Sequence, residues 1–121
     1  MSTMEITTEN FEQVVDGNDI VVLDATAEWC GPCRTFAPVY EAASTRHPDV
    51  LWGKLDTEDH PDVAAAFEIR AVPTLMVFRE GILVFQQAGM LPADALDILV
   101  GEVKKPDMED VRQQLEDQNR A

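Results

Sequence analysis

The stretch IVVLDA at residues 20–25 constrains the fold of this chain more than any other segment. It is a nearly continuous apolar run, interrupted only by the carboxylate of Asp24. Such a run is typical of a strand buried on both faces, and this burial occurs mainly where helices cover both sides of a parallel sheet. The rest of the chain therefore has to supply those helices.

The remaining segments do supply helices, in alternation with further strands. Apolar residues with helical spacing precede the central run and recur over residues 33–47 and 92–104, and Pro61 opens a short helix. Strand patterns cover residues 50–55 and the runs TLMVF and ILVFQ, which flank a short connection containing Gly81. The order βαβαβαββα predicts an α/β domain with parallel strands and one antiparallel hairpin.

A proline at position 106 separates this domain, residues 1–105, from a C-terminal extension at residues 106–121. The extension has a narrow apolar stripe at helical spacing: Met108, Val111 and Leu115. Two interpretations of this segment stay open. It is either a marginal helix that docks on the domain's own surface or frays, or a contact for a partner or a second copy.

The balance of charges narrows the choice of partners. Nine Lys and Arg against 23 Asp and Glu give a formal net charge of −14, which repels nucleic acid and anionic membranes. No apolar run approaches the roughly 18 residues of a membrane-spanning helix. The N-terminal stretch MSTMEITTEN lacks the basic region and apolar core of a secretory signal, so we expect a cytoplasmic protein.

Both cysteines of the chain, Cys30 and Cys33, lie in EWCGPCR at residues 28–34. A structural zinc site normally needs four ligands, and His47 and His60 lack metal-ligand spacing, so we expect no metal. A structural disulfide here would close too short a loop to restrain the unfolded chain, and the expected compartment is reducing. Redox chemistry is the interpretation that is left.

The surroundings of the two cysteines favour this chemistry. The strand at residues 20–25 ends just before the motif and a helix begins within it, so Cys30 should lie at a helix N-terminus, where a thiolate is stabilised. We expect the pKa of this thiol to fall from about 8.5 towards neutrality. Cys33 lies one turn further on, within disulfide reach, and Pro32 suits the first turn of the helix.

With these residues the chain closely resembles the thioredoxin family. The matching segments are WCGPC at 29–33 with the preceding VVLDATAE, GKLD at 53–56, and RAVPTLMVFREG at 70–81, and they follow in order along residues 5–104. Besides the two cysteines, five residues inside or near these segments stand at the family's positions: Asp24, Pro38, Lys54, Pro73 and Gly89.

The resemblance implies a thioredoxin fold, with a five-stranded mixed sheet in the order 1-3-2-4-5 flanked by four helices. It also implies a protein-disulfide reductase and electron carrier in cell redox homeostasis. Cys30 would attack a client disulfide and Cys33 would resolve the mixed disulfide. The protein would be a monomer with no bound cofactor, and thioredoxin reductase, an NADPH-dependent flavoprotein, would restore the dithiol.

Asp24 is expected to have a raised pKa, because a carboxylate within an apolar strand is costly to ionise. By the resemblance it would relay protons to or from Cys33, with Lys54 nearby to tune its charge. The alternative is a buried carboxylate satisfied by backbone groups or by an ion pair with Lys54.

The resemblance also implies an apolar client-docking surface around Cys30, with a cis bond between Val72 and Pro73 that lets Val72 hydrogen-bond an extended client segment. Eight residues would form this surface: Trp29, Gly31, Pro32, Ala71, Val72, Pro73, Ala88 and Gly89.

The chain departs from the family at Ala25 and Thr26, where aromatic residues are common, and we expect looser packing beneath the active-site loop. Two alternative functions stay open. One is a disulfide oxidant or isomerase, and the other is a binding subunit with the same fold in which the thiols matter little.

Overall fold

The computed structural model describes residues 2–120 and contains five strands and five helices within them. Along the chain these are β1 (Thr3–Ile6), α1 (Phe11–Gly17), β2 (Ile20–Thr26), α2 (Gly31–Arg46), β3 (Leu51–Asp56), α3 (Pro61–Ala66), β4 (Thr74–Arg79), β5 (Ile82–Ala88), α4 (Ala93–Val103) and α5 (Met108–Arg120). The predicted alternation is confirmed, with α5 added at its end.

The strands form one mixed sheet in the order β1-β3-β2-β4-β5. The pairs β1–β3 and β2–β3 are parallel, whereas β2–β4 and β4–β5 are antiparallel. The expected strand order is therefore confirmed. The apolar run at residues 20–25 lies in the central strand β2, whose residues from Ile20 to Ala25 are all buried.

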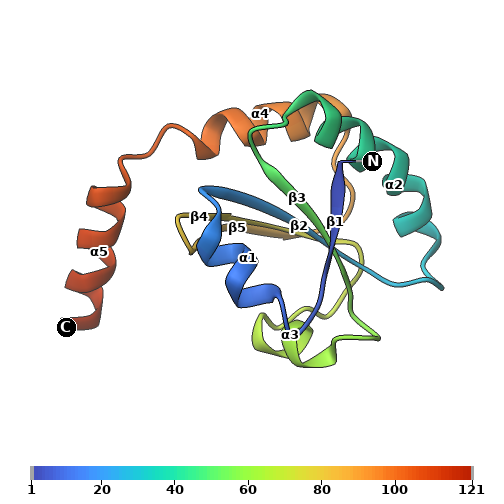
Figure 1. Ribbon diagram of the computed structural model, residues 1–121, viewed down its shortest axis with the longest axis horizontal. Coiled ribbons are helices and arrows are strands. Elements are labelled where there is room, and N and C mark those ends of the chain that lie inside the picture. Colours follow the sequence, from blue (N-terminus) through green and yellow to red (C-terminus); the bar gives the residue numbers. More distant parts are fainter. Residues whose placement is uncertain (1, 121) are drawn as a thin grey trace.

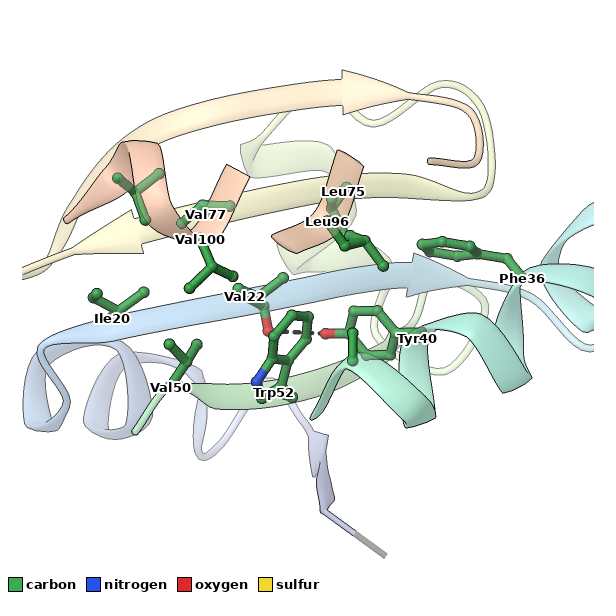
Figure 2. Close-up of a cluster of buried hydrophobic side chains, with 12 residues drawn as sticks. Ile20, Val22, Phe36, Tyr40, Val50, Trp52, Leu75, Val77, Leu96 and Val100 are labelled. Atoms are coloured by element: carbon green, nitrogen blue, oxygen red, sulfur yellow. Dashed lines mark hydrogen bonds between the residues drawn. The ribbon is translucent and has the colours of Figure 1, made fainter. Parts of the chain in front are cut away.

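Helices cover both faces of the sheet, with α2 and α4 on one side and α1 and α3 on the other (Figure 1). Each face has its own apolar core, since a strand sends alternate side chains to opposite sides. Figure 2 shows the core under α2 and α4, where Tyr40 and Trp52 pack edge to face with ring centroids 5.2 Å apart.

A buried hydroxyl ties α2 to the sheet. The Tyr40 hydroxyl lies 3.0 Å from the carbonyl oxygen of Val22 on β2 (Figure 2). It also lies 2.6 Å from the carbonyl oxygen of Gly53 on β3. Tyr40 is fully buried, so this polar contact replaces the water that its hydroxyl loses on folding. Helix α2 is thereby fixed above the two central strands.

Helix α2 begins two residues earlier than the sequence pattern indicates. The backbone N–H of Cys33 donates to the Cys30 sulfur at 3.1 Å, so Cys30 is the N-cap and Gly31 is the first helical residue. Pro32 fits this first turn because the first backbone N–H groups of a helix have no partner within it.

The C-terminal helix α5 docks through its first turns and then extends away from the sheet (Figure 1). Met108 is buried, and the Arg112 guanidinium pairs with Glu80 at 2.7 Å, whereas Leu115 is 40% exposed. The docking interpretation is therefore confirmed for the start of the helix, and the partner interpretation stays a hypothesis for the rest. Among residues 2–120, no helix has both the length and the apolar character needed to cross a membrane.

Candidate functional site

The two cysteines lie together at the N-terminus of α2, as the sequence predicts. They form a disulfide with their Cα atoms 5.2 Å apart, and only 3% of Cys30 and 4% of Cys33 is exposed. Cys30 caps the helix and Cys33 lies in its first turn. The two sulfurs therefore occupy different environments, one at the helix end and one beneath it.

The environment of the Cys30 sulfur suits a negative charge. The N-terminus of a 16-residue helix points at it, and the Cys33 N–H already donates to it. An unpaired helix N-terminus and a direct N–H donor both stabilise an anion. The site can therefore hold Cys30 as a thiolate once the disulfide is reduced.

A second loop brings the Val72–Pro73 peptide bond beside this sulfur. The bond is cis, as expected, and the Val72 carbonyl oxygen lies 3.6 Å from the Cys30 sulfur. The backbone N–H of Gly89 donates to the Pro73 carbonyl at 2.8 Å, with Gly89 at a φ of +102° that favours glycine. Three segments that are distant in sequence thus meet around one sulfur.

Most of the expected docking residues are exposed around the disulfide. Trp29 is 68% exposed, and its indole N–H donates to Glu58 at 2.7 Å, which fixes the orientation of the ring. Five of the others are exposed at the rim, and a sixth, Val72, is half-buried: Gly31, Pro32, Ala71, Ala88, Gly89 and Val72. Pro73 differs, because it is buried and supports the loop from below.

Asp24 is the buried carboxylate among residues 2–120. It is 2% exposed, and within residues 2–120 its Oδ1 atom has no hydrogen-bond partner. Burial raises the pKa of Asp24 to about 7, and the positive charge of Lys54 opposes this rise. The expected direction is confirmed, and the carboxyl can take up or release a proton near neutral pH.

Lys54 lies opposite Asp24 in the register of β2 and β3, but it pairs with a different carboxylate. Its Nζ atom is 3.0 Å from Glu41 Oε1 on α2, and the Thr3 hydroxyl donates to the same oxygen at 2.9 Å. Partial burial raises the pKa of Glu41, but the hydrogen bonds from Lys54 and Thr3 outweigh it and lower that pKa overall.

Glu41 is the residue that the sequence reasoning missed. It stands eight positions after Cys33, so the two lie on the same side of α2. This spacing was the signal in the sequence that could have placed Glu41 on the side of α2 that carries Cys33. Asp24 and Lys54 form no ion pair within residues 2–120, because the ammonium of Lys54 pairs with Glu41 instead.

The two small residues after Asp24 have different surroundings. Ala25 is fully buried, while Thr26 is half-buried and lines a depression of about 160 Å³ that also touches Cys33. The expected looser packing beneath the active-site loop stays a prediction. Within the described chain, residues 2–120, no group of three or more His, Cys, Asp or Glu side chains could hold a metal ion.

Comparisons with a family model and with known proteins all indicate the same family. The family model described as thioredoxin matches residues 2–102. The Streptomyces coelicolor protein that carries the name thioredoxin 2 is 50% identical over 117 residues, covering 97% of this chain and 87% of its own. The thioredoxin of Alicyclobacillus acidocaldarius is 38% identical over 103 residues, covering 84% and 98%.

A solved structure agrees with these sequence matches. A mutant thioredoxin from Halobacterium salinarum superposes with a TM-score of 0.81 at 30% identity, over 88% of this chain and 94% of its own.

Proposed function

Because the chain belongs to the thioredoxin family, whose members are thiol–disulfide oxidoreductases, we propose that Cys30 is its attacking thiol and Cys33 its resolving thiol. The protein works by dithiol–disulfide exchange. The observation that supports this assignment is the Cys30 sulfur at the N-terminus of α2, where the Cys33 N–H donates to it at 3.1 Å. Cys33 lies inside the first turn, where it can reach Cys30 but not a bulky client.

In the first step, the Cys30 thiolate attacks one sulfur of a client disulfide. The client S–S bond breaks, a Cys30–client bond forms, and the other client sulfur leaves as a thiolate that takes a proton from solvent. The backbone of Val72, beside the Cys30 sulfur, hydrogen-bonds the client segment in the manner of strand addition. The exposed rim around Trp29 supplies the apolar contact.

In the second step, Cys33 resolves the mixed disulfide. The Cys33 thiol gives its proton to the Asp24 carboxylate, its sulfur attacks Cys30, and the remaining client sulfur leaves as a thiolate. Two electrons have then passed from the dithiol to the client, and Cys30 and Cys33 are joined. The pKa of Asp24 of about 7 supports this role, since the group can both accept and release the proton.

The proposal extends to the supply of electrons. No cofactor is needed by a dithiol exchanger, and an NADPH-dependent flavoprotein reductase would return the Cys30–Cys33 disulfide to the dithiol. We place the monomeric protein in the cytoplasm, where such reductants keep thiols reduced, with residues 1–105 as the catalytic domain and residues 106–121 as an extension.

The test is catalysed reduction of a protein disulfide by a small dithiol, measured for the wild-type protein and for Cys30→Ser and Cys33→Ser. We expect both variants to lose turnover. Only Cys33→Ser should accumulate a mixed disulfide with the client, seen by non-reducing electrophoresis, because only it retains the attacking sulfur. Trapping by Cys30→Ser instead would reverse the two assigned roles. Unchanged turnover in both variants would leave the binding subunit as the better interpretation.

A further inference from the structure

An apolar groove lies between the first half of α2 and the loop that joins β5 to α4. It has a volume of about 340 Å³, and six residues define it: Thr35, Phe36, Val39, Met90, Leu91 and Pro92. None of the six is charged, although charged residues make up 26% of the chain. None of them belongs to the eight residues of the client-docking surface either, so the proposed function leaves this groove without a role.

The floor of the apolar groove is fixed, and one of its walls is adaptable. Phe36 is 1% exposed and belongs to the core under α2 and α4 (Figure 2). Val39 and Leu91 pack against the same core. Met90, by contrast, is 48% exposed, and its unbranched side chain can adjust to guests of different shape. The groove can therefore hold an apolar side chain without any change in the core beneath it.

Thr35 lines the groove without presenting an unsatisfied polar group. Its hydroxyl donates to the carbonyl oxygen of Gly31, one turn earlier in α2, at 3.3 Å. A hydroxyl that already has a partner in the protein loses less when water is removed from it. An apolar side chain can therefore displace water from the groove at little polar cost.

Two segments lead from the client-docking surface directly into the apolar groove. On α2, the exposed Gly31 is followed at intervals of four by Thr35 and Val39, and residues four apart lie on the same side of a helix. After β5, the exposed Gly89 is followed directly by Met90. The groove is therefore continuous with the surface that surrounds the reactive sulfur.

The same spacing limits which client residue can reach the groove. Four helical residues advance about 6 Å, so Thr35 and Val39 lie about 6 Å and about 12 Å along α2 from Gly31. An extended chain covers these lengths in about two to four residues. Alternate side chains of an extended segment point the same way, so a side chain two or four positions from the client cysteine faces the protein together with that cysteine.

The charge of the chain favours a client over a second copy as the occupant of the groove. At a formal net charge of −14, two copies of the chain repel each other. A client is held by its bond to Cys30, so a neighbouring side chain enters the groove in what is effectively an intramolecular step. Even a modest apolar contact then affects how well the client is captured.

We propose that the apolar groove is a client subsite, which binds an aliphatic side chain two or four positions from the reacting cysteine and so determines which disulfides are reduced fastest. This inference rests on the proposed function. The bond changes stay the same: the Cys30 thiolate attacks the client sulfur, the client S–S bond breaks, and its electron pair leaves on the other sulfur. The groove contributes by holding the client sulfur in position for this attack.

The test measures capture of short peptides by the Cys33→Ser protein, in which Cys30 forms a mixed disulfide that is not resolved. Each uncharged peptide has one cysteine, joined by a disulfide to thionitrobenzoate, whose release is followed by absorbance. Leucine stands two or four positions before or after the cysteine, and the reference peptide has serine at all four positions. We expect leucine at one of them to speed capture about tenfold, or about 1.4 kcal/mol, close to the lower end of what a buried leucine contributes.

A double variant, Met90→Gln with Thr35→Gln, makes two sides of the groove polar and should reduce the preference for leucine over serine to about twofold or less. The ratio of the two rates is the readout, because a change in the reactivity of Cys30 affects both peptides alike. Both substituted positions are exposed, so we expect the variant to fold.

The matched control is Met4→Gln with Thr45→Gln, which should keep the tenfold preference. Met4 is a similarly exposed methionine, 42% against 48% for Met90, and it lies on β1 at the far edge of the sheet from β5. The Thr45 hydroxyl donates to a carbonyl oxygen one turn earlier in α2 at 3.3 Å, as that of Thr35 does.

The outcomes distinguish this inference from the proposed function. A leucine preference that is lost in the groove variant and kept in the control supports the subsite. Equal capture of leucine and serine peptides overturns the subsite while leaving the role of Cys30 intact. A preference that survives in the groove variant also overturns it, since the leucine then binds elsewhere, as in the depression of about 140 Å³ beside Trp29. A preference lost in both variants counts against the subsite as well, because the control leaves the groove unchanged. Failure of the Cys33→Ser protein to capture any peptide would instead overturn the proposed function.

Discussion

At the scale of single residues, the fold changes the charge state of Asp24 more than that of the other acidic groups near the site. Burial raises its pKa from 3.8 to about 7, and Lys54 only partly opposes this. The folded protein therefore holds the proton over a pH range in which the unfolded chain has already released it. The contribution of Asp24 to stability is largest below its unfolded pKa and is lost as the pH rises to about 7.

This predicts that Asp24→Asn stabilises the protein at high pH and not at low pH. The shift of about three pH units corresponds to an upper limit of about 4 kcal/mol in the free energy of unfolding at about pH 8, and to none near pH 3.5. Urea denaturation at both pH values measures the difference. Equal effects at the two values would show that the charge of Asp24 is not the cause.

Gly53 is a second position that the fold restricts, because the core around it leaves no room for a side chain. A Cβ atom at this position would lie 2.6 Å from a carbon of Ile6 and 2.7 Å from one of Leu23, both in the core. We expect Gly53→Ala to lower the free energy of unfolding by about 1–3 kcal/mol through overpacking. Gly101→Ala is the matched control in α4, where the added carbon meets nothing within 4 Å and should stabilise by up to about 1 kcal/mol. A neutral Gly53→Ala would mean that the core is less tightly packed there.

At the scale of elements, the docking of α5 depends on a few contacts at its start. Met108 is 5% exposed, and Arg112 reaches Glu80 in the turn between β4 and β5. The Arg79 guanidinium also donates to the carbonyl oxygen of Val103 at 2.8 Å, just before the helix. These contacts hold the first two turns, and the later turns add little burial.

Met108→Ala should therefore cost more stability than Leu115→Ala, although both lie on the same apolar stripe. We expect about 2 kcal/mol for the buried methionine and less than about 0.5 kcal/mol for the exposed leucine, both measured by urea denaturation. Because α5 lies away from the disulfide, neither variant should change the rate of client reduction (Figure 1). A larger effect for Leu115→Ala would indicate that this part of the helix is covered in solution, as in contact with a second copy.

At the scale of the whole molecule, the formal net charge of −14 opposes compaction. Seven of the nine Lys and Arg side chains already take part in ion pairs within residues 2–120, so most of the excess carboxylates have no cation to offset them.

Screening by salt should consequently stabilise the protein. Between about 0.01 M and 0.5 M NaCl, the Debye length falls from about 30 Å to less than 10 Å, and we expect the Tm to rise by several degrees. A double variant, Glu9→Gln with Glu116→Gln, removes two exposed charges that make no ion pair with another residue of 2–120, and should show a smaller rise. A Tm that falls with salt would mean that the ion pairs outweigh the repulsion.

The elements themselves could be predicted from the sequence because their signals are local. The buried strand of Asp24, the N-terminal position of Cys30 and the raised pKa of Asp24 all follow from residues a few positions apart. The strand order and the cis bond before Pro73 came from resemblance to the thioredoxin family, since neither is a property of a short segment.

The tertiary structure alone decided which side chains from different elements meet. It paired Lys54 with Glu41 on α2, buried Pro73 beneath its loop, and left a depression between Thr26 and Ala37. The physical reason is that apolar periodicity specifies which face of an element is buried but not what packs against it. Such contacts depend on how helix and sheet fit together in space, and small side chains change that fit without changing the pattern.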